Sequence, residues 1–209
     1  LQRPRVDGGA NWGGAAHDPE TNRLYVRTSE GTSPNQVCAI DPSVQDVDVP
    51  YTNNCARGGS AGIFAGLDGY VPAERSRLGP IPLTKPPYAR LVSIDLNVGD
   101  IAWSVPFGEG SRVVRSHPLL RDADLPERLG TPGANGPMVT GGGLVFLGGG
   151  DPYLYAFDAQ TGEEITRVPT EFRTSGNPMS YRSRAGKQFL LIATGAGPDA
   201  KLVAFALPD

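Results

Sequence analysis

A strand–turn–strand unit that occurs twice in the chain constrains its fold more than any other feature. The first copy covers residues 90–105 (RLVSIDLNVGDIAWSV), and the second covers residues 153–168 (YLYAFDAQTGEEITRV). In each copy an aspartate, Asp95 or Asp158, ends the first strand and a glycine-bearing turn follows. A small sheet built from such units needs neighbouring sheets to cover its faces, so the repeat predicts radial or solenoid stacking. Four-stranded blades of about 40–50 residues, with insertions, favour a β-propeller.

The repeat also predicts how neighbouring blades touch. Trp103 of the first copy is expected to pack between blades, whereas the second copy has Ile165 or Thr166 at that place, which predicts a weaker contact. Residues 37–41 resemble the front of the unit, and residues 202–207 resemble a terminal version of its strand. No stretch shows helical periodicity over more than a turn or two, so the predicted class is all-β.

The remaining segments predict strands joined by a long irregular insertion. Residues 24–28 and 36–42 have the pattern of a β-hairpin. Residues 44–83 are rich in glycine and proline and predict an insertion, a type of loop that is usually functional or disordered. Within it, residues 58–62 match a G-x-S-x-G nucleophile elbow, but neither the strand before nor the helix after that this motif needs is predicted. Residues 85–88 (KPPY) predict a rigid lead into the next strand or, alternatively, a polyproline-type ligand for a partner.

Composition narrows the function classes. Glycine and proline together supply 28 and 20 of the 209 residues, while 39% of residues are apolar, which indicates many turns around a real core. A net charge of −3 leaves no basic footprint for nucleic acid. No apolar run approaches the roughly 18 residues of a membrane helix, and the first residues lack a signal-peptide pattern. Two histidines argue against a zinc centre, and Cys38 and Cys55 could form a disulfide or remain free thiols.

The segment GGANWGGAAHDPETNRLYV at residues 8–26 presents a polar side chain and a flat ring on a tight loop. Paired glycines flank Asn11 and Trp12, and the DPETN run that follows is a turn before a strand. This segment resembles the Asn-Trp segment of pyrroloquinoline quinone (PQQ)-dependent dehydrogenases, in particular the branch that contains membrane-bound glucose dehydrogenase. Further stretches agree with that family in the same order: KPPY at 85–88, LGTP at 129–132, GPMVT at 136–140, NPMSY at 177–181, GKQF at 186–189 and VAFALP at 203–208.

The resemblance implies the architecture and the setting. The chain would be the C-terminal three to four blades of an eight-bladed quinoprotein propeller, a single partial propeller over 1–209 with the insertion at about 44–83. An open arc of blades leaves a sheet face and strand edges uncovered, so the remaining blades are expected on the same chain or on a companion chain. A self-sufficient four-bladed closure is the alternative. The family is exported or periplasmic, and its export signals and any anchor are expected on sequence missing from this chain.

The resemblance assigns cofactor contacts to three residues. PQQ is a flat tricarboxylated quinone, whose site needs amide and backbone N–H donors together with rings that exclude water. Asn11 and Trp12 are expected to lie against it; the alternative is a plain Asn turn with Trp12 filling the core. Asp151 follows a glycine triplet at the end of the apolar stretch 144–147 and would line the active site. The alternative for Asp151 is a surface Asp-Pro turn.

The implied function is the oxidation of an alcohol or sugar hydroxyl, with electrons passed to a quinone or cytochrome acceptor. In the family, Ca²⁺ polarises the quinone and a carboxylate takes the proton of the substrate. The metal ligands and the catalytic base are expected on blades outside this chain, so no catalytic or metal residue is assigned and the chain alone is expected to be inactive. The run 193–198 lacks the histidine of glucose-oxidising relatives, and Tyr155 replaces their arginine; both departures argue against glucose. The competing hypothesis is a non-catalytic propeller module for binding or assembly.

Overall fold

Strands make up most of the regular structure. The computed structural model describes residues 2–4, 8–32, 38–40, 48, 50–52 and 81–207. Their helical content is one turn of α-helix, α1 (Arg112–Arg115), and two short 3-10 segments, η2 (Pro118–Leu120) and η3 (Gly197–Asp199). The all-β prediction is confirmed. None of the helices in these residues is long and apolar enough to span a membrane.

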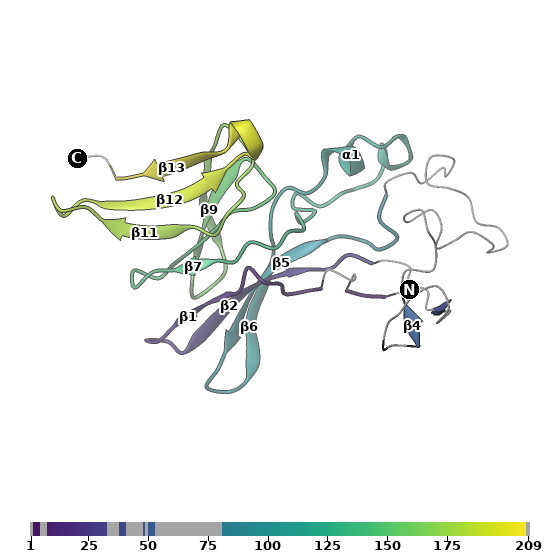
Figure 1. Ribbon diagram of the computed structural model, residues 1–209, viewed down its shortest axis with the longest axis horizontal. Helices are drawn as coiled ribbons and strands as arrows, with labels where there is room; N and C mark the ends of the chain where they lie inside the picture. The colour runs from purple at the N-terminus through teal and green to yellow at the C-terminus, as the bar shows by residue number, and fades with distance from the viewer. Residues whose placement is uncertain are drawn as a thin grey trace.

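Of the four antiparallel sheets in the described residues, three have three or four strands and follow one another along the chain (Figure 1). Sheet 1 has the order β1 (Ala15–Asp18), β2 (Arg23–Ser29), β5 (Ala89–Asp95) and β6 (Asp100–Pro106). Sheet 2 has the order β7 (Met138–Val139), β8 (Leu144–Leu147), β9 (Tyr153–Asp158) and β10 (Glu164–Pro169). Sheet 3 has the order β11 (Met179–Arg182), β12 (Gln188–Thr194) and β13 (Lys201–Phe205).

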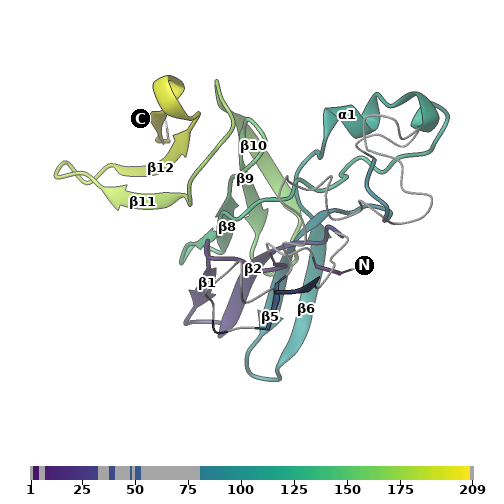
Figure 2. The same cartoon turned by 45° about the vertical axis from the view of Figure 1, so that its right-hand side comes forward.

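The sheets are propeller blades. Each is an antiparallel meander whose strands lie in chain order, and the sheets stand beside one another, as a second view also shows (Figure 2). The first strands of sheets 1 and 2, β1 and β7, lie side by side, which identifies them as the inner edges of neighbouring blades. Side-by-side meanders of this kind are how a propeller covers its sheet faces.

The predicted hairpin of residues 24–28 with 36–42 is wrong. β2 pairs with β1 on one side and with β5 on the other, in the latter case over seven residues from Arg23 to Ser29. The described part of the second segment is β3 (Cys38–Ala39), which pairs with β4 (Tyr51–Thr52). β5 offers β2 a pairing of seven residues with a buried face, and this is favoured over a short local hairpin.

The repeat is visible in hydrogen bonds and in register. The Asp95 carboxylate accepts from the Asn97 backbone N–H (2.9 Å), and the Asp158 carboxylate accepts from the N–H groups of Gln160 and Thr161 (2.8 and 2.7 Å). The bonds from Thr161 hold the pKa of Asp158 below its ordinary value. In both units the strand after the turn carries one extra residue that has no partner across the ladder: Ala102 in β6 and Ile165 in β10. The same β-bulge therefore recurs at the same place in both copies.

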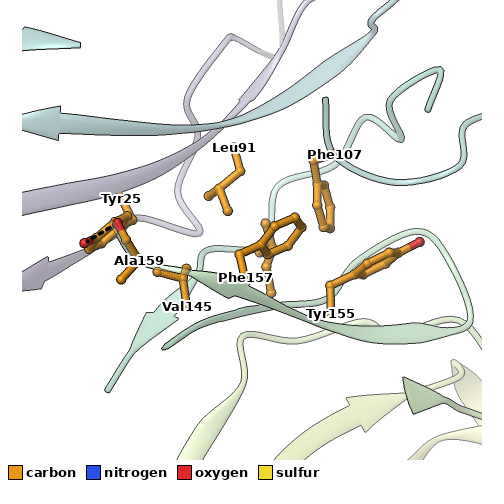
Figure 3. Packing of buried hydrophobic residues seen from close by; sticks show 8 residues of the cluster. Tyr25, Leu91, Phe107, Val145, Tyr155, Phe157 and Ala159 are labelled. Carbon is orange, nitrogen blue, oxygen red and sulfur yellow. Dashed lines mark hydrogen bonds between the residues drawn. The ribbon is translucent and has the colours of Figure 1, made fainter. Parts of the chain in front are cut away.

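The core lies between sheets 1 and 2 (Figure 3). Tyr25, Leu91 and Phe107 from sheet 1 and its exit face Tyr155 and Phe157 of sheet 2, and all five are fully or almost fully buried. β2 buries alternate residues, as expected for a strand with one covered face, whereas β9 buries four in succession. Sheet 2 stands between the other two, and its strand β9 is buried on both faces.

Trp103 joins sheets 1 and 2, as predicted. Its indole N–H donates to the Ala159 carbonyl (3.1 Å), and its ring contacts Tyr25, with a centroid separation of 5.8 Å. The contact between sheets 2 and 3 is looser. There a groove of about 870 Å³ remains open, and its lining includes Ile165 and Thr166. The weaker second contact is thereby confirmed.

The lead-in segment 85–88 ends on a buried residue. The Tyr88 backbone N–H donates to the Leu129 carbonyl (2.7 Å), its carbonyl accepts from Glu30, and β5 begins at the next residue. This fits the rigid lead rather than a free polyproline ligand. Most of the predicted insertion 44–83, including the G-x-S-x-G run and Cys55, lies outside the described residues.

Candidate functional site

A pocket of about 330 Å³ opens where the loop before β1 meets the loop before β7. It is lined by Gly8, Asn11, Trp12, Ser29, Pro132, Gly133 and Ala134. Two of the three predicted cofactor residues therefore share one pocket.

Asn11 and Trp12 form a turn whose ring is left uncovered. The Asn11 carboxamide oxygen accepts from the Trp12 backbone N–H (2.7 Å), and the Asn11 carbonyl accepts from Gly14 (3.0 Å). The Asn turn considered from the sequence is present, but Trp12 does not fill the core, because its side chain is 87% exposed. A large uncovered ring beside a pocket is free to contact a bound ligand or another part of the protein.

Close backbone packing fixes this loop against the loop before β7. A Cβ added at Gly13 would overlap the Ala134 carbonyl, and one added at Gly136 would overlap the Gly13 carbonyl. Only glycine permits this approach. The Ser29 hydroxyl at the end of β2 bonds both the N–H and the carbonyl of Gly133 (3.2 Å each), so the pocket wall is tied to sheet 1.

A buried cation lies beneath the pocket wall. The Arg27 guanidinium donates to the carbonyls of Thr131 (2.7 Å) and Gly149 (3.0 Å) and stands 4.8 Å from the ring centre of Phe107. A side chain at Gly133, which lines the pocket, would collide with it. Burial lowers the pKa of Arg27 to about 10, and the negative charge of Asp151 offsets part of that effect. Arg27 is thus charged at neutral pH.

Asp151 is buried, with 7% of its surface exposed, and is not among the residues that line the pocket. Its carboxylate accepts from the Thr131 hydroxyl (2.8 Å), the Glu109 backbone N–H (2.8 Å) and the Tyr155 hydroxyl (3.0 Å). Burial, together with the charge of Asp151, raises the pKa of Tyr155. The surface-turn alternative for Asp151 is therefore wrong. Thr131, its partner, directly precedes the pocket residue Pro132.

Sequence reasoning missed the second wall of the pocket. Residues 129–132 contributed to the family resemblance but were assigned no role. Ser29 was also assigned no role, because a serine that follows a strand is common. The sequence feature that could have indicated this wall is the Thr-Pro-Gly run at 131–133, which predicts a turn ahead of the next strand. Among the residues that the structure describes, no group of three His, Cys, Asp or Glu side chains could hold a metal ion.

Comparisons with known proteins agree on one group. The family model described as "PQQ: Glucose/ethanol/alcohol dehydrogenase, beta-propeller domain" matches residues 1–190. A protein of Xanthomonas campestris pv. juglandis named "Probable quinate dehydrogenase (quinone)" is 33% identical over the whole chain, which covers 27% of that protein. The quinate/shikimate dehydrogenase (quinone) of Acinetobacter baylyi is 32% identical over 93% of the chain, which covers 24% of that protein.

A solved structure supports the fold. The quinohemoprotein alcohol dehydrogenase from Comamonas testosteroni superimposes with a TM-score of 0.56 at 24% identity, over 92% of this chain and 23% of that one. The chain thus spans about a quarter of the length of the proteins it matches.

Proposed function

The chain belongs to the β-propeller family of PQQ-dependent glucose, ethanol and alcohol dehydrogenases, and from that premise we propose that its pocket forms one wall of a PQQ site. In this proposal the chain is the C-terminal portion of an enzyme that oxidises a hydroxyl group, and the remaining blades, on the same or a companion chain, complete the site. The enzyme is exported to the periplasm.

The observation that carries the proposal is the uncovered Trp12 ring beside Asn11 on a loop fixed across two sheets. The donor set fits one side of PQQ. A flat ring matches a flat quinone, and an amide with backbone N–H groups matches carboxylate and carbonyl oxygens.

Each residue has a definite task in this arrangement. Trp12 covers one face of the cofactor and excludes water from it. Asn11 orients the cofactor edge by its carboxamide, and Ser29 holds the opposite wall through Gly133. Asp151 does not line the pocket, but it accepts a hydrogen bond from Thr131 and so holds the start of the wall at Pro132. When bound, PQQ supplies the hydride acceptor for the oxidation.

The Ca²⁺ ligands and the base that takes the substrate proton would be supplied by the other blades, since the described residues offer no metal cluster. The two quinate dehydrogenases among the relatives, and the departures from the glucose-oxidising pattern, favour a small polyhydroxylated substrate other than glucose. Their names also favour a quinone as electron acceptor; a relative from Thauera butanivorans is named for cytochrome c, which keeps a cytochrome as the second choice.

The test is the native and denatured mass of the protein purified with PQQ and Ca²⁺, together with its absorbance and its dye-linked dehydrogenase activity. A denatured mass well above 22.0 kDa, or a fixed companion chain, with quinone absorbance retained, is expected. Activity is expected with quinate or another polyol and to be low with glucose. A clean 22.0 kDa monomer without PQQ would overturn the enzyme proposal and favour the non-catalytic binding module.

A pair of variants ties the binding to the pocket. Trp12→Ala should weaken PQQ binding by about tenfold, the effect of one lost ring contact of roughly 1.4 kcal/mol. Tyr181→Ala removes an exposed ring of β11 that stacks on Phe189, outside the pocket, and should leave the affinity unchanged. Equal affinities for wild type and Trp12→Ala would place the cofactor elsewhere.

A further inference from the structure

Three loops precede the first strands of the three sheets, and hydrogen bonds join them beside the pocket. Residues 8–14 lead into β1, residues 131–137 lead into β7, and residues 174–178 lead into β11. The first two form the pocket walls. The third contributes no wall residue, but it places the side chain of Asn177 against both of the others.

Asn177 bridges the two walls with its single carboxamide. Its Nδ2 donates to the Gly13 carbonyl (2.8 Å), and its Oδ1 accepts from the Gly136 backbone N–H (2.7 Å). These are the two glycines whose backbones touch. Gly136 is buried, and removing the carboxamide would take away the protein partner of its backbone N–H.

These bonds determine which part of the pocket Asn177 can hold in place. Gly13 directly follows Trp12, so a bond to the Gly13 carbonyl holds the Gly13–Gly14 peptide and, through it, the loop that carries the exposed ring. Trp12 has almost no packing of its own, with 87% of its side chain exposed, so its direction depends on the backbone that carries it. The bond comes from sheet 3, 164 residues further along the chain.

We propose that Asn177 is a positioning residue of the pocket: by joining Gly13 to Gly136 it holds Asn11 and Trp12 in the arrangement that binds the ligand, and it makes that arrangement depend on sheet 3. The identity of the ligand as PQQ rests on the function proposed above. The ordering of the loop does not, because it follows from contacts within this chain.

The test compares Asn177→Ala with Asn97→Ala in the whole protein. Asn97 is a matched control, since its side chain also joins two segments, accepting from Asn22 (2.9 Å) and donating to the Thr21 carbonyl (3.4 Å), at the distant turns of sheet 1. Asn177→Ala should lose at least as much thermal stability as Asn97→Ala. Only Asn177→Ala should weaken PQQ binding, by about tenfold, because the loop would spend only a fraction of its time in the binding arrangement.

A spectroscopic readout separates positioning from general damage. In protein labelled with 5-fluorotryptophan, the ¹⁹F signal of Trp12, assigned with Trp12→Phe, should shift or broaden in Asn177→Ala before any ligand is added. The signal of Trp103 should stay unchanged in the same variant. An unchanged Trp12 signal would overturn the proposal. If wild-type protein binds no PQQ while the Trp12 signal still responds, the function proposed above fails and the positioning role stands.

A second variant keeps the test usable if Asn177→Ala does not fold. Asn177→Asp has the same size and retains an acceptor for the Gly136 N–H, but it turns a carboxylate oxygen toward the Gly13 carbonyl. It should disturb the Trp12 signal and PQQ binding while sparing the loop before β7. Wild-type behaviour of both Trp12 and PQQ binding in Asn177→Asp would contradict the proposal.

Discussion

Asp151 and Arg27 are buried charges beside the pocket, and each is held by groups from distant parts of the chain. Asp151 receives bonds from Thr131, Glu109 and Tyr155, which lie up to 42 residues away. Arg27 reaches carbonyls more than 100 residues away. Buried charges are stable only when they are satisfied in this way, so removing one partner costs more than a single exposed hydrogen bond.

Asp151→Ala should therefore lower the free energy of unfolding by about 3 kcal/mol, since it leaves buried donors unpaired and Arg27 without its nearby negative charge. Urea unfolding followed by circular dichroism measures the loss. Asp100→Ala is the control: it removes an exposed carboxylate on β6 whose one hydrogen bond within the described residues comes from the adjacent Ile101 N–H (2.7 Å), and about 0.5 kcal/mol or less is expected. Similar losses for the two variants would show that the Asp151 cluster carries no special stability.

At the residue scale, the local sequence predicted one wall of the pocket but not the buried groups behind it. Flanking glycines were enough to predict that Asn11 and Trp12 sit on a tight loop, because that is a local property of the backbone. The burial of Asp151 and the bridges of Ser29 and Asn177 arise from contacts between sheets. Local composition contains no information about which distant carbonyl a serine or asparagine will meet.

At the scale of strands and sheets, one residue difference between the two copies of the repeat distinguishes a tight contact between sheets from a loose one. Trp103 and Thr166 occupy the same place after the same bulge, yet the tryptophan joins sheets 1 and 2 while the threonine lines an open groove. The repeat predicted this difference correctly, because its period is fixed by turn chemistry at Asp95 and Asp158. The predicted hairpin failed because strand pairing between distant segments depends on buried surface, which turn signals do not report.

Trp103→Ala should lower the free energy of unfolding by about 3 kcal/mol, as it removes a half-buried ring and leaves a cavity between two sheets. The equivalent change in the other copy, Thr166→Ala, should cost less than about 1 kcal/mol, because that side chain borders the groove. Thermal or urea unfolding of both variants is the measurement. If Thr166→Ala were as damaging as Trp103→Ala, the groove between sheets 2 and 3 would have to be closed in solution.

At the scale of the whole molecule, the three sheets differ in how far the rest of the chain covers their faces and edges. In sheet 2, β9 is buried on both faces, whereas β13 pairs with β12 alone among the described strands. Apolar side chains near this edge are exposed, with Leu202 at 72% and Leu207 at 84%. An open, apolar strand edge is a template for pairing with another chain, and natural proteins usually guard such edges with charge or cover. The resemblance to eight-bladed propellers predicted uncovered edges of this kind, although it could not say which strand would carry them.

The 209-residue chain expressed by itself should consequently associate through this edge. Light scattering coupled to size exclusion should give an average molar mass above 22.0 kDa that rises with protein concentration. Leu202→Lys places a charge on the edge strand and should bring the mass toward 22.0 kDa. Val98→Lys is the control, because Val98 is equally exposed, at 74%, but lies in the turn between β5 and β6. A wild-type mass of 22.0 kDa at every concentration would show that the β13 edge does not recruit another chain. Only the membership of the family would then favour further blades beyond this chain.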